Sequence, residues 1–122
     1  VNKVINAEDT LEIWGEGKAS RDIIYIDDLI DFIDKCIDNQ EDMYELYNCG
    51  GGAAYPILEL AKTIMRLNDK ELDFKFDLTK PDIPTTVILD CQKAGRDLGW
   101  TPTTSLEEGL RRTCEWYKNN VQ

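Results

Sequence analysis

Apolar and polar residues alternate along several short runs of the chain, and this pattern predicts β-strands. Leu11 and Ile13 flank the polar Glu12, which is the spacing of a strand with one buried face. Further runs rich in β-branched, aromatic or alternating apolar residues predict strands at residues 23–26, 44–48, 72–76 and 86–89. Gly15 and Gly17 follow the first strand at once, so we expect a tight turn there.

Between these runs, apolar residues recur at every third or fourth position, which predicts helices. We expect them at about residues 28–38, 56–67, 92–98 and 105–117, and the first ten residues have the pattern of a helix end leading into a strand. Asp27 and Asp28 are expected to cap the 28–38 helix, and Ser105 and Glu108 have the spacing of a capping box. The apolar face of the 28–38 helix consists of Leu29, Ile30, Ile33, Cys36 and Ile37.

Because helices alternate with a few strands, the sequence predicts the α/β class, as a small mixed α+β domain. The 122 residues are one domain's worth of chain, so we assign 1–122 to a single domain. No apolar run has the length of a membrane span, and no signal-peptide pattern opens the chain. Cys36, Cys49, Cys91 and Cys114 form no C-x-x-C pair, and no histidine completes a zinc site. They fall inside apolar runs, so we expect buried, reduced thiols and a cytoplasmic protein.

The net charge of −10 argues against nucleic acid or an anionic membrane as a partner, because both would be repelled. The absence of histidine excludes Ser-His and Cys-His catalytic pairs. An acidic row at helical spacing consists of Asp27, Asp31, Asp34 and Asp38. Such carboxylates can bind a metal, but the spacing favours a solvated helix face, so we predict no metal site.

The chain offers few groups for binding a ligand. Residues 50–52 are three glycines between a predicted strand and a helix, but no nucleotide-binding glycine fingerprint is present, which favours a plain turn. Arg21 would either hold a phosphate with its guanidinium or pair with Asp22 or another carboxylate. Trp14 would either fill the core or a sheet edge, or stack on a base or sugar. Lys80 is by default a solvated loop lysine.

The segment WGEGKASRDIIYIDD at residues 14–28 resembles the pattern WG-x-G-x3-RD-x-x-Y-x-DD of a known family. That family is the NAD-dependent epimerase/dehydratases, extended short-chain dehydrogenase/reductases that act on nucleotide sugars. The resemblance continues through LYNCGGG at residues 46–52, TKPDIPTTVILDCQKAGRDLGWTP at 79–102 and SLEEGLRRTCEWY at 105–117. In the family, these segments lie in this order in the C-terminal, substrate-binding part.

Within the family, the K-P-D motif followed by a second aspartate, Asp82 and Asp90 here, is most similar to the GDP-4-keto-6-deoxymannose epimerase/reductases. In those enzymes, the tryptophan before the glycine turn, the arginine seven residues later and the lysine of K-P-D are associated with the GDP-sugar. The resemblance therefore implies that Trp14, Arg21 and Lys80 bind a nucleotide sugar, with a GDP-sugar favoured.

The resemblance also implies functional parts that this sequence lacks. The family binds NADP or NAD through an N-terminal Rossmann domain, and it uses a Ser/Thr and a Tyr-x-x-x-Lys pair in catalysis. None of the five tyrosines here has a lysine four residues later. We therefore expect no catalytic or cofactor-binding residues in these 122 residues, and no activity from this chain alone. The expected partners are a nucleotide sugar, the missing Rossmann domain and a second subunit of a homodimeric full-length enzyme.

Two alternatives remain from the sequence. Relatives that act on UDP- or dTDP-sugars share the RD-x-x-Y segment and the LGW-x-P ending, so the base of the ligand is open. The second alternative is a non-catalytic module that binds a nucleotide sugar or a partner protein.

Overall fold

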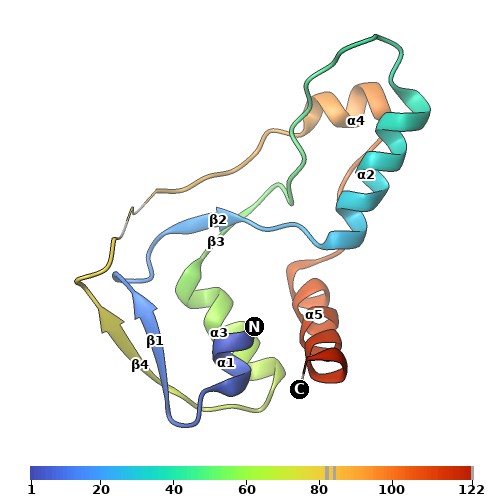
Figure 1. Cartoon of the computed structure of the whole chain (residues 1–122). Coiled ribbons are helices and arrows are strands. Elements are labelled where there is room, and N and C mark those ends of the chain that lie inside the picture. Colours follow the sequence, from blue (N-terminus) through green and yellow to red (C-terminus); the bar gives the residue numbers. More distant parts are fainter. Residues whose placement is uncertain (82, 84, 122) are drawn as a thin grey trace.

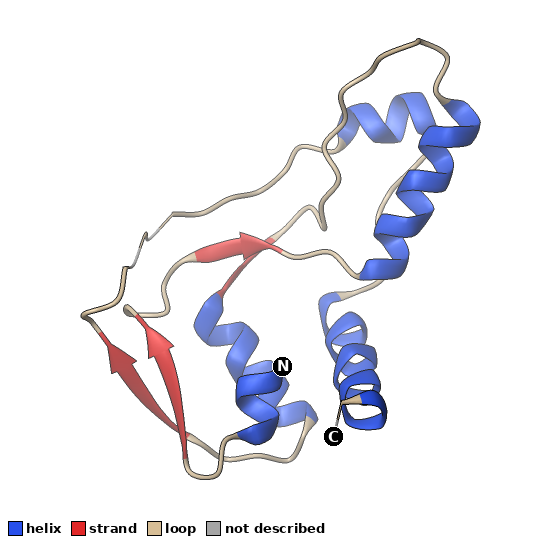
Figure 2. Cartoon of the chain, in the orientation of Figure 1, coloured by secondary structure: helices blue, strands red, loops and turns tan. Residues whose placement is uncertain are grey.

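The computed structural model describes residues 1–81, 83 and 85–121, and its elements are arranged in two groups. In chain order they are α1 (Asn2–Asn6), β1 (Thr10–Trp14), β2 (Ser20–Asp22), α2 (Ile26–Asn39), β3 (Ala54–Pro56), α3 (Ile57–Leu67), β4 (Asp73–Asp77), α4 (Gln92–Leu98) and α5 (Leu106–Asn120). Figure 1 shows β1, β4, α1 and α3 at one end of the molecule, and α2 with α4 at the other. Long loops join the two ends, as Figure 2 shows. The predicted mixed α/β class is confirmed.

The strands form two short sheets of two strands each within the described residues. β1 runs parallel to β4, so Leu11 lies opposite Phe74 and Ile13 opposite Phe76. β2 is antiparallel to β3, and this pairing places Arg21 opposite Tyr55. The strands predicted around residues 11–13 and 72–76 are therefore confirmed, whereas β3 was not predicted.

Three other predicted strands do not form as expected. β2 ends at Asp22 and α2 begins at Ile26, so the strand predicted at residues 23–26 is wrong. Residues 44–48 form no strand, and of residues 86–89 only Thr86 makes a bridge, to Ser20. A strand requires a neighbouring segment that completes its ladder of hydrogen bonds. Apart from the bridge of Thr86 to Ser20, the described part of the chain supplies no such neighbour to these runs.

The first of two buried clusters lies where β1 meets α1, α3 and α5. Its members are Val4, Ile5, Leu11, Ile13, Ala61, Ile64, Leu72 and Cys114. Lys70 closes its edge, because its ammonium group donates to the carbonyls of Ile5 and Ala7 at the C-terminal end of α1. A cation is favourable at that end of a helix, where the carbonyls carry partial negative charge.

The second buried cluster forms around Trp100, which is 1% exposed. Ala94 and Leu98 of α4 pack with it, and Phe32 of α2 meets the indole edge-on with ring centroids 5.1 Å apart. The indole N–H of Trp100 donates to the carbonyl of Asp28 at 3.1 Å, which satisfies the one polar atom of this ring. Trp100 therefore fixes α2 against α4. The helix predicted at residues 92–98 is confirmed.

The first turn of α2 differs from the prediction. Tyr25 occupies the N-cap position without a side-chain hydrogen bond, so neither Asp27 nor Asp28 is the cap. The buried Asp28 carboxylate instead accepts from the Thr103 N–H and hydroxyl and from the Thr104 N–H, at 2.9–3.2 Å. Burial alone would raise the pKa of Asp28, but these hydrogen bonds outweigh it and lower the pKa.

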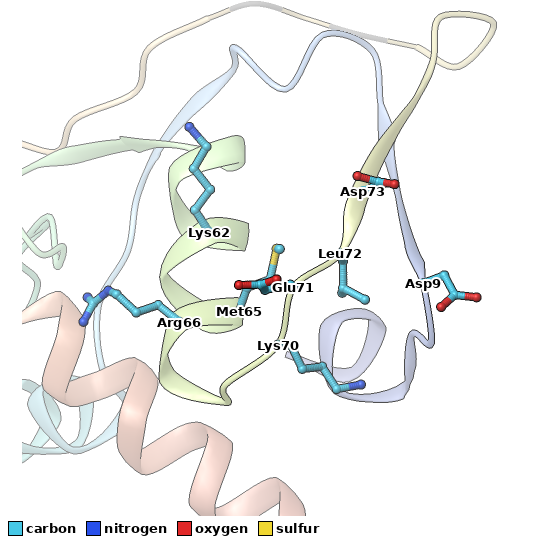
Figure 3. A pocket seen from close by; sticks show the side chains of 8 residues that line it. All are labelled: Asp9, Lys62, Met65, Arg66, Lys70, Glu71, Leu72 and Asp73. Atoms are coloured by element: carbon cyan, nitrogen blue, oxygen red, sulfur yellow. The ribbon is translucent and has the colours of Figure 1, made fainter.

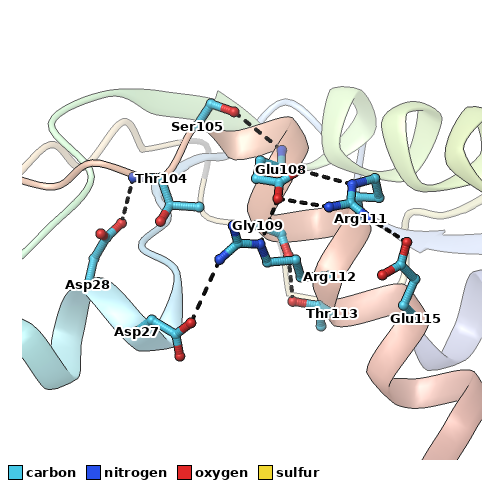
Figure 4. Close-up of polar contacts among 10 residues, drawn as sticks. All are labelled: Asp27, Asp28, Thr104, Ser105, Glu108, Gly109, Arg111, Arg112, Thr113 and Glu115. Atoms are coloured by element: carbon cyan, nitrogen blue, oxygen red, sulfur yellow. Dashed lines mark hydrogen bonds and ion pairs between the residues drawn. The ribbon is translucent and has the colours of Figure 1, made fainter.

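Figure 4 shows how the start of α5 is fixed next to α2. The Ser105 hydroxyl accepts from the Glu108 N–H at 3.3 Å, which confirms the predicted cap. Hydrogen bonds from Arg111 and Arg112 lower the pKa of Glu108 to about 2. Arg112 also reaches Asp27 of α2 at 3.8 Å, so a chain of charged groups links the two helices.

Only part of the apolar face that was predicted for α2 is packed against the protein. Leu29 and Cys36 are half-buried on the inner side, whereas Ile30, Ile33 and Ile37 are exposed. The predicted acidic row on the same helix is exposed to solvent. No group of metal-binding side chains occurs among the described residues.

The cysteines are unpaired thiols, as expected. The expected burial holds for Cys114 alone, because the other three are only half-buried. Burial raises the pKa of Cys49 to about 11, so this thiol stays protonated at neutral pH. Within the described residues, no helix has the length and apolar character needed to cross a membrane.

Replacing Asp28 by asparagine tests the contact between α2 and the Thr103–Thr104 segment. We expect Asp28→Asn to lower the free energy of unfolding by about 1–3 kcal/mol at neutral pH, because it weakens charge-assisted hydrogen bonds. The lowered pKa means that the contribution of Asp28 is present above its ordinary pKa and is lost as the pH falls through the folded-state value. Urea unfolding over a falling pH series should therefore show the difference between variant and wild type shrinking in acid.

The matched control is Asp31→Asn, which removes an exposed carboxylate from the same helix. It should change the free energy of unfolding by less than about 0.5 kcal/mol. Equal losses in the two variants would contradict the assigned role of Asp28.

Candidate functional site

The candidate site is a hollow of about 430 Å³ at the C-terminal end of β1. Its lining includes two of the residues predicted from sequence, Trp14 and Arg21, and the third, Lys80, has its ammonium nitrogen 5.5 Å from the centre of the Trp14 ring. The full lining is Lys3, Glu12, Ile13, Trp14, Ala19, Arg21, Ile57, Pro81 and Ile83. Folding therefore brings together residues that are 59 positions apart, from Arg21 to Lys80.

The turn after β1 positions the side chains of this hollow. Gly15 and Gly17 have φ angles of +64° and +68°, which confirms the predicted tight turn. The Gly15 N–H donates to the carbonyl of Asp77 at the end of β4, and the Leu58 N–H donates to the carbonyl of Gly17. The turn is thus attached both to the neighbouring strand and to the start of α3. This attachment holds β1 and β2 at the angle that forms the hollow.

Trp14 is a surface residue of the site and not part of the core, since 53% of it is exposed. Its indole N–H donates to the Glu12 carboxylate at 3.0 Å, which restrains the ring. The ammonium groups of Lys3 and Lys80 lie 5.3 and 5.5 Å from the ring centre, within the range of a cation–π interaction. The result is an exposed aromatic surface with two cations beside it.

Lys3 is a site residue that the sequence did not identify. It lies in α1, whose neighbouring residues Val4 and Ile5 are buried in the core. The only sequence signal is this pattern, which puts Lys3 on the side of the helix away from the core. Its position next to Trp14 depends on the packing of α1 against β1, which local sequence does not reveal.

The guanidinium group of Arg21 is held in place by hydrogen bonds from one of its nitrogens. Nη1 donates to the carbonyls of Ser20 and Thr85, each at 2.8 Å. The alternative of an ion pair with Asp22 is wrong, and the described residues contain no ion pair of Arg21 with another carboxylate. Arg21 therefore ties β2 to the segment around Thr85, and its charge faces the hollow without a neutralising partner among the described residues.

Asp22 has a structural role on the opposite side of β2. Its carboxylate accepts from the N–H groups of Gly51 at 2.6 Å, Gly52 at 3.3 Å and Leu89 at 3.0 Å. Two backbone donors of the triglycine loop, those of Gly51 and Gly52, are therefore already used. Residues 50–52 lie between residues 44–48, which form no strand, and strand β3, so the predicted strand-to-helix turn does not form.

A larger hollow, of about 570 Å³, lies elsewhere and contains none of the predicted site residues (Figure 3). It is lined by the outer side of α3 and the start of β4, including Lys62, Arg66 and Lys70. These cations are engaged: Lys62 pairs with Glu59, Arg66 pairs with Glu107, and Lys70 binds the end of α1. Three carboxylates share the same rim, so the hollow does not favour an anion.

The charges and the exposed ring around Trp14 suit an anion with an attached ring. Three cations, Lys3, Arg21 and Lys80, gather there although the chain carries a net charge of −10. The one carboxylate in the lining, Glu12, is bound to the indole of Trp14. Asp82 of the K-P-D motif lies outside the described residues.

Comparison with known proteins points to one family over nearly the whole chain. The family model described as GDP-mannose 4,6 dehydratase matches residues 1–113. GDP-L-fucose synthase 1 of Arabidopsis thaliana is 34% identical over 117 residues, which cover 96% of this chain and 36% of that protein.

Solved structures of two further enzymes have the same fold. UDP-glucose 4-epimerase of Thermotoga maritima, determined with UDP-glucose, matches with a TM-score of 0.79 and 31% identity, over 99% of this chain and 38% of that one. The dTDP-glucose 4,6-dehydratase of Bacillus anthracis, in complex with NAD, matches with a TM-score of 0.80 and 25% identity, over 98% of this chain and 38% of that one.

The chain spans little more than a third of the length of these relatives, 36% to 38%. Its elements match the C-terminal portions of these enzymes, as the sequence resemblance implied. The family match over residues 1–113 and the shared fold lead to one conclusion. This chain belongs to the GDP-mannose 4,6 dehydratase family, and it is a C-terminal part of an extended short-chain dehydrogenase/reductase.

Proposed function

We propose that this chain binds the nucleotide part of a nucleotide sugar for an NAD(P)-dependent epimerase/reductase, with GDP-L-fucose synthase as the favoured activity. The observation that carries this proposal is that Trp14 and Arg21 line one hollow, with the Lys80 ammonium group 5.5 Å from the centre of the Trp14 ring. GDP-L-fucose synthase 1 is among the relatives, which supports a GDP-sugar as the ligand. The UDP-glucose and dTDP-glucose enzymes among the solved structures keep UDP- and dTDP-sugars as the alternatives.

Each cation of the site has a distinct part in the proposed binding. The Arg21 guanidinium is oriented by Ser20 and Thr85 through Nη1, and its other nitrogens supply a planar fork for a phosphate. Lys3 and Lys80 are point charges on flexible side chains, suited to the second phosphate. A base or sugar that stacks on Trp14 would take the place of an ammonium group at the ring and leave that cation for the pyrophosphate.

In this proposal, residues outside this chain carry out the chemical step. The NADP or NAD of the full-length enzyme would be held by its Rossmann domain, since no glycine fingerprint occurs in these 122 residues. The chain contributes binding and orientation: a pyrophosphate fixed by Arg21 sets where the sugar lies relative to the cofactor. In the full-length enzyme we also propose a homodimer.

Substitution of the cations tests the binding site. We expect Arg21→Ala to weaken GDP binding about tenfold or more, because each charge-assisted hydrogen bond contributes about 1.5–3 kcal/mol. Lys80→Ala and Lys3→Ala should each weaken binding a few fold, since both side chains are exposed. Calorimetric titration with GDP, UDP and dTDP measures these effects and ranks the bases.

The control is Lys118→Ala, which removes an exposed lysine of α5 remote from the hollow. Thermal melting of each variant separates lost binding from lost folding, which matters for Arg21 because it also holds Thr85. GDP affinity that is equal in Arg21→Ala, Lys80→Ala and Lys118→Ala would contradict the proposed site.

A second prediction concerns the reaction itself. We expect no nucleotide-sugar-dependent oxidation of NADPH by the 122-residue chain, because its sequence lacks the Tyr-x-x-x-Lys pair and the cofactor fingerprint. Absorbance at the NADPH band, followed with GDP-4-keto-6-deoxymannose as substrate, measures this. Turnover by the 122-residue chain would contradict the proposal that the catalytic and cofactor-binding residues lie outside it.

A further inference from the structure

Asp77, the last residue of β4, is hydrogen-bonded to both turns that carry the candidate site. β4 runs parallel to β1, so the two strands end side by side, and Asp77 lies opposite Trp14 (Figure 1). The Asp77 carbonyl accepts from the Gly15 N–H at 3.0 Å and from the Lys80 N–H at 3.4 Å. One backbone oxygen therefore joins the glycine turn after Trp14 to the turn that ends at Lys80.

The side chain of Asp77 stabilises the second of these turns. Its Oδ1 atom accepts from the Thr79 N–H at 3.0 Å and from the Thr79 hydroxyl at 2.6 Å. An aspartate that accepts from the backbone two residues further on stabilises a turn at its own position. The hydrogen bonds from Thr79 also lower the pKa of Asp77, so this carboxylate is ionised at neutral pH.

The backbone of Lys80 is restrained on both sides. Lys80 precedes Pro81, and a residue before proline is biased toward extended conformations. The turn at Asp77 restrains it from the other side, and Pro81 itself lines the hollow. The Lys80 side chain, in contrast, is exposed and forms no ion pair among the described residues. The position of its ammonium group, 5.5 Å from the centre of the Trp14 ring, therefore depends mainly on the backbone.

We propose that Asp77 is a positioning residue of the nucleotide site: its carboxylate fixes the turn at residues 77–80, so that Lys80 lies beside Trp14 before the ligand binds. This inference rests on the proposed function, because it requires Lys80 to contact the nucleotide. Asp77 itself does not touch the ligand in this role. A lysine on an unrestrained loop would lose more conformational entropy when it binds, and the turn at Asp77 reduces that loss.

The direction of the effect separates positioning from simple electrostatics. Asp77 carries a negative charge on the residue opposite Trp14, close to where a phosphate would bind. By Coulomb's law, removal of this charge alone should tighten the binding of an anion. Positioning predicts weaker binding, because loss of the carboxylate frees the turn that holds Lys80. A variant that keeps the acceptor oxygen but loses the charge distinguishes the two contributions.

Calorimetric titration with GDP tests this role in the polypeptide encoded by the complete reading frame that contains this sequence. We expect Asp77→Ala to weaken binding about fourfold, and by no more than Lys80→Ala does, because Asp77 acts through that lysine. Asp77→Asn should stay within about 1.5-fold of the wild type, since the asparagine oxygen also accepts from Thr79. The matched control is Asp73→Ala, which removes an exposed carboxylate from the other end of β4 and should likewise stay within about 1.5-fold.

Double substitutions show whether Asp77 acts through Lys80. In the Lys80→Ala background, Asp77→Ala should change the affinity by less than about 1.5-fold, because no lysine is left to position. In the Arg21→Ala background, it should cause the same loss of about fourfold as in the wild type. Arg21 is oriented by the carbonyls of Ser20 and Thr85 and therefore does not depend on the Asp77 side chain.

Thermal melting of each variant separates weaker binding from weaker folding. If Asp77→Ala does not fold, Thr79→Ala takes its place in the same backgrounds, because it removes the hydroxyl donor and leaves the charge of Asp77 unchanged. Thr79→Ala should weaken GDP binding about twofold, less than Asp77→Ala, since the backbone N–H of residue 79 remains. This loss should disappear in the Lys80→Ala background.

Three results would overturn the inference while GDP binding still depends on Arg21 and Lys80. They are unchanged or tighter binding by Asp77→Ala, an equal loss in Asp77→Asn, or the same loss when Lys80 is already alanine. GDP binding that depends on Arg21 but not on Lys80 would also overturn it. Absence of nucleotide binding by the wild type would instead refute the proposed function, and this inference with it. Binding of UDP or dTDP in place of GDP, with Asp77 still coupled to Lys80, would support the positioning role and correct only the base.

Discussion

The fold depends most on the Asp22 carboxylate, because it joins β2 both to the loop before β3 and to the segment around Leu89. It accepts hydrogen bonds from Gly51 and Gly52 on one side and from Leu89 on the other. In a molecule whose described strands form only two pairs, this carboxylate does what additional ladder hydrogen bonds would do in a larger sheet. A carboxylate with several backbone donors is well suited to this, since charge-assisted hydrogen bonds are about twice as strong as neutral ones. Successive side chains of a strand point to opposite faces, so fixing Asp22 behind β2 directs Arg21 toward the hollow.

The parts of the fold that could be predicted from sequence are those whose causes are local. The turn at Gly15 and Gly17, the alternation around Leu11 and the Ser105 cap all depend on neighbouring residues, and all were predicted. The strands expected at residues 23–26, 44–48 and 86–89 depend on a partner segment, which propensity does not supply. Asp28 shows the same limit: it had the sequence signature of a helix cap, but the distant Thr103 and Thr104 engage it.

Part of the candidate site was predicted from family resemblance and not from local sequence patterns. Family resemblance indicated Trp14, Arg21 and Lys80, and folding brings them together, but no local pattern identified Lys3 or explained how Arg21 is oriented. Lys3 reaches Trp14 through the packing of α1, and Thr85 orients Arg21 from a segment 64 residues away. The charge at the candidate site also differs in sign from the net charge of the chain. The chain has ten excess negative charges, but three cations lie together at one hollow. The net charge therefore disfavours extended anionic surfaces, while the local charge of the hollow favours a small anion.

The different surroundings of the three tryptophans have a practical consequence for spectroscopy. Trp100 is enclosed in the second cluster, Trp14 lies beside two ammonium groups at the candidate site, and Trp116 lines the groove between α2 and α5. A buried indole emits at shorter wavelength than a solvated one, and nearby charges and stacked rings alter its emission. The intrinsic fluorescence of this chain therefore contains separate signals from the second buried cluster, the candidate site and the groove between α2 and α5. Three single Trp→Phe variants would assign them without any added label.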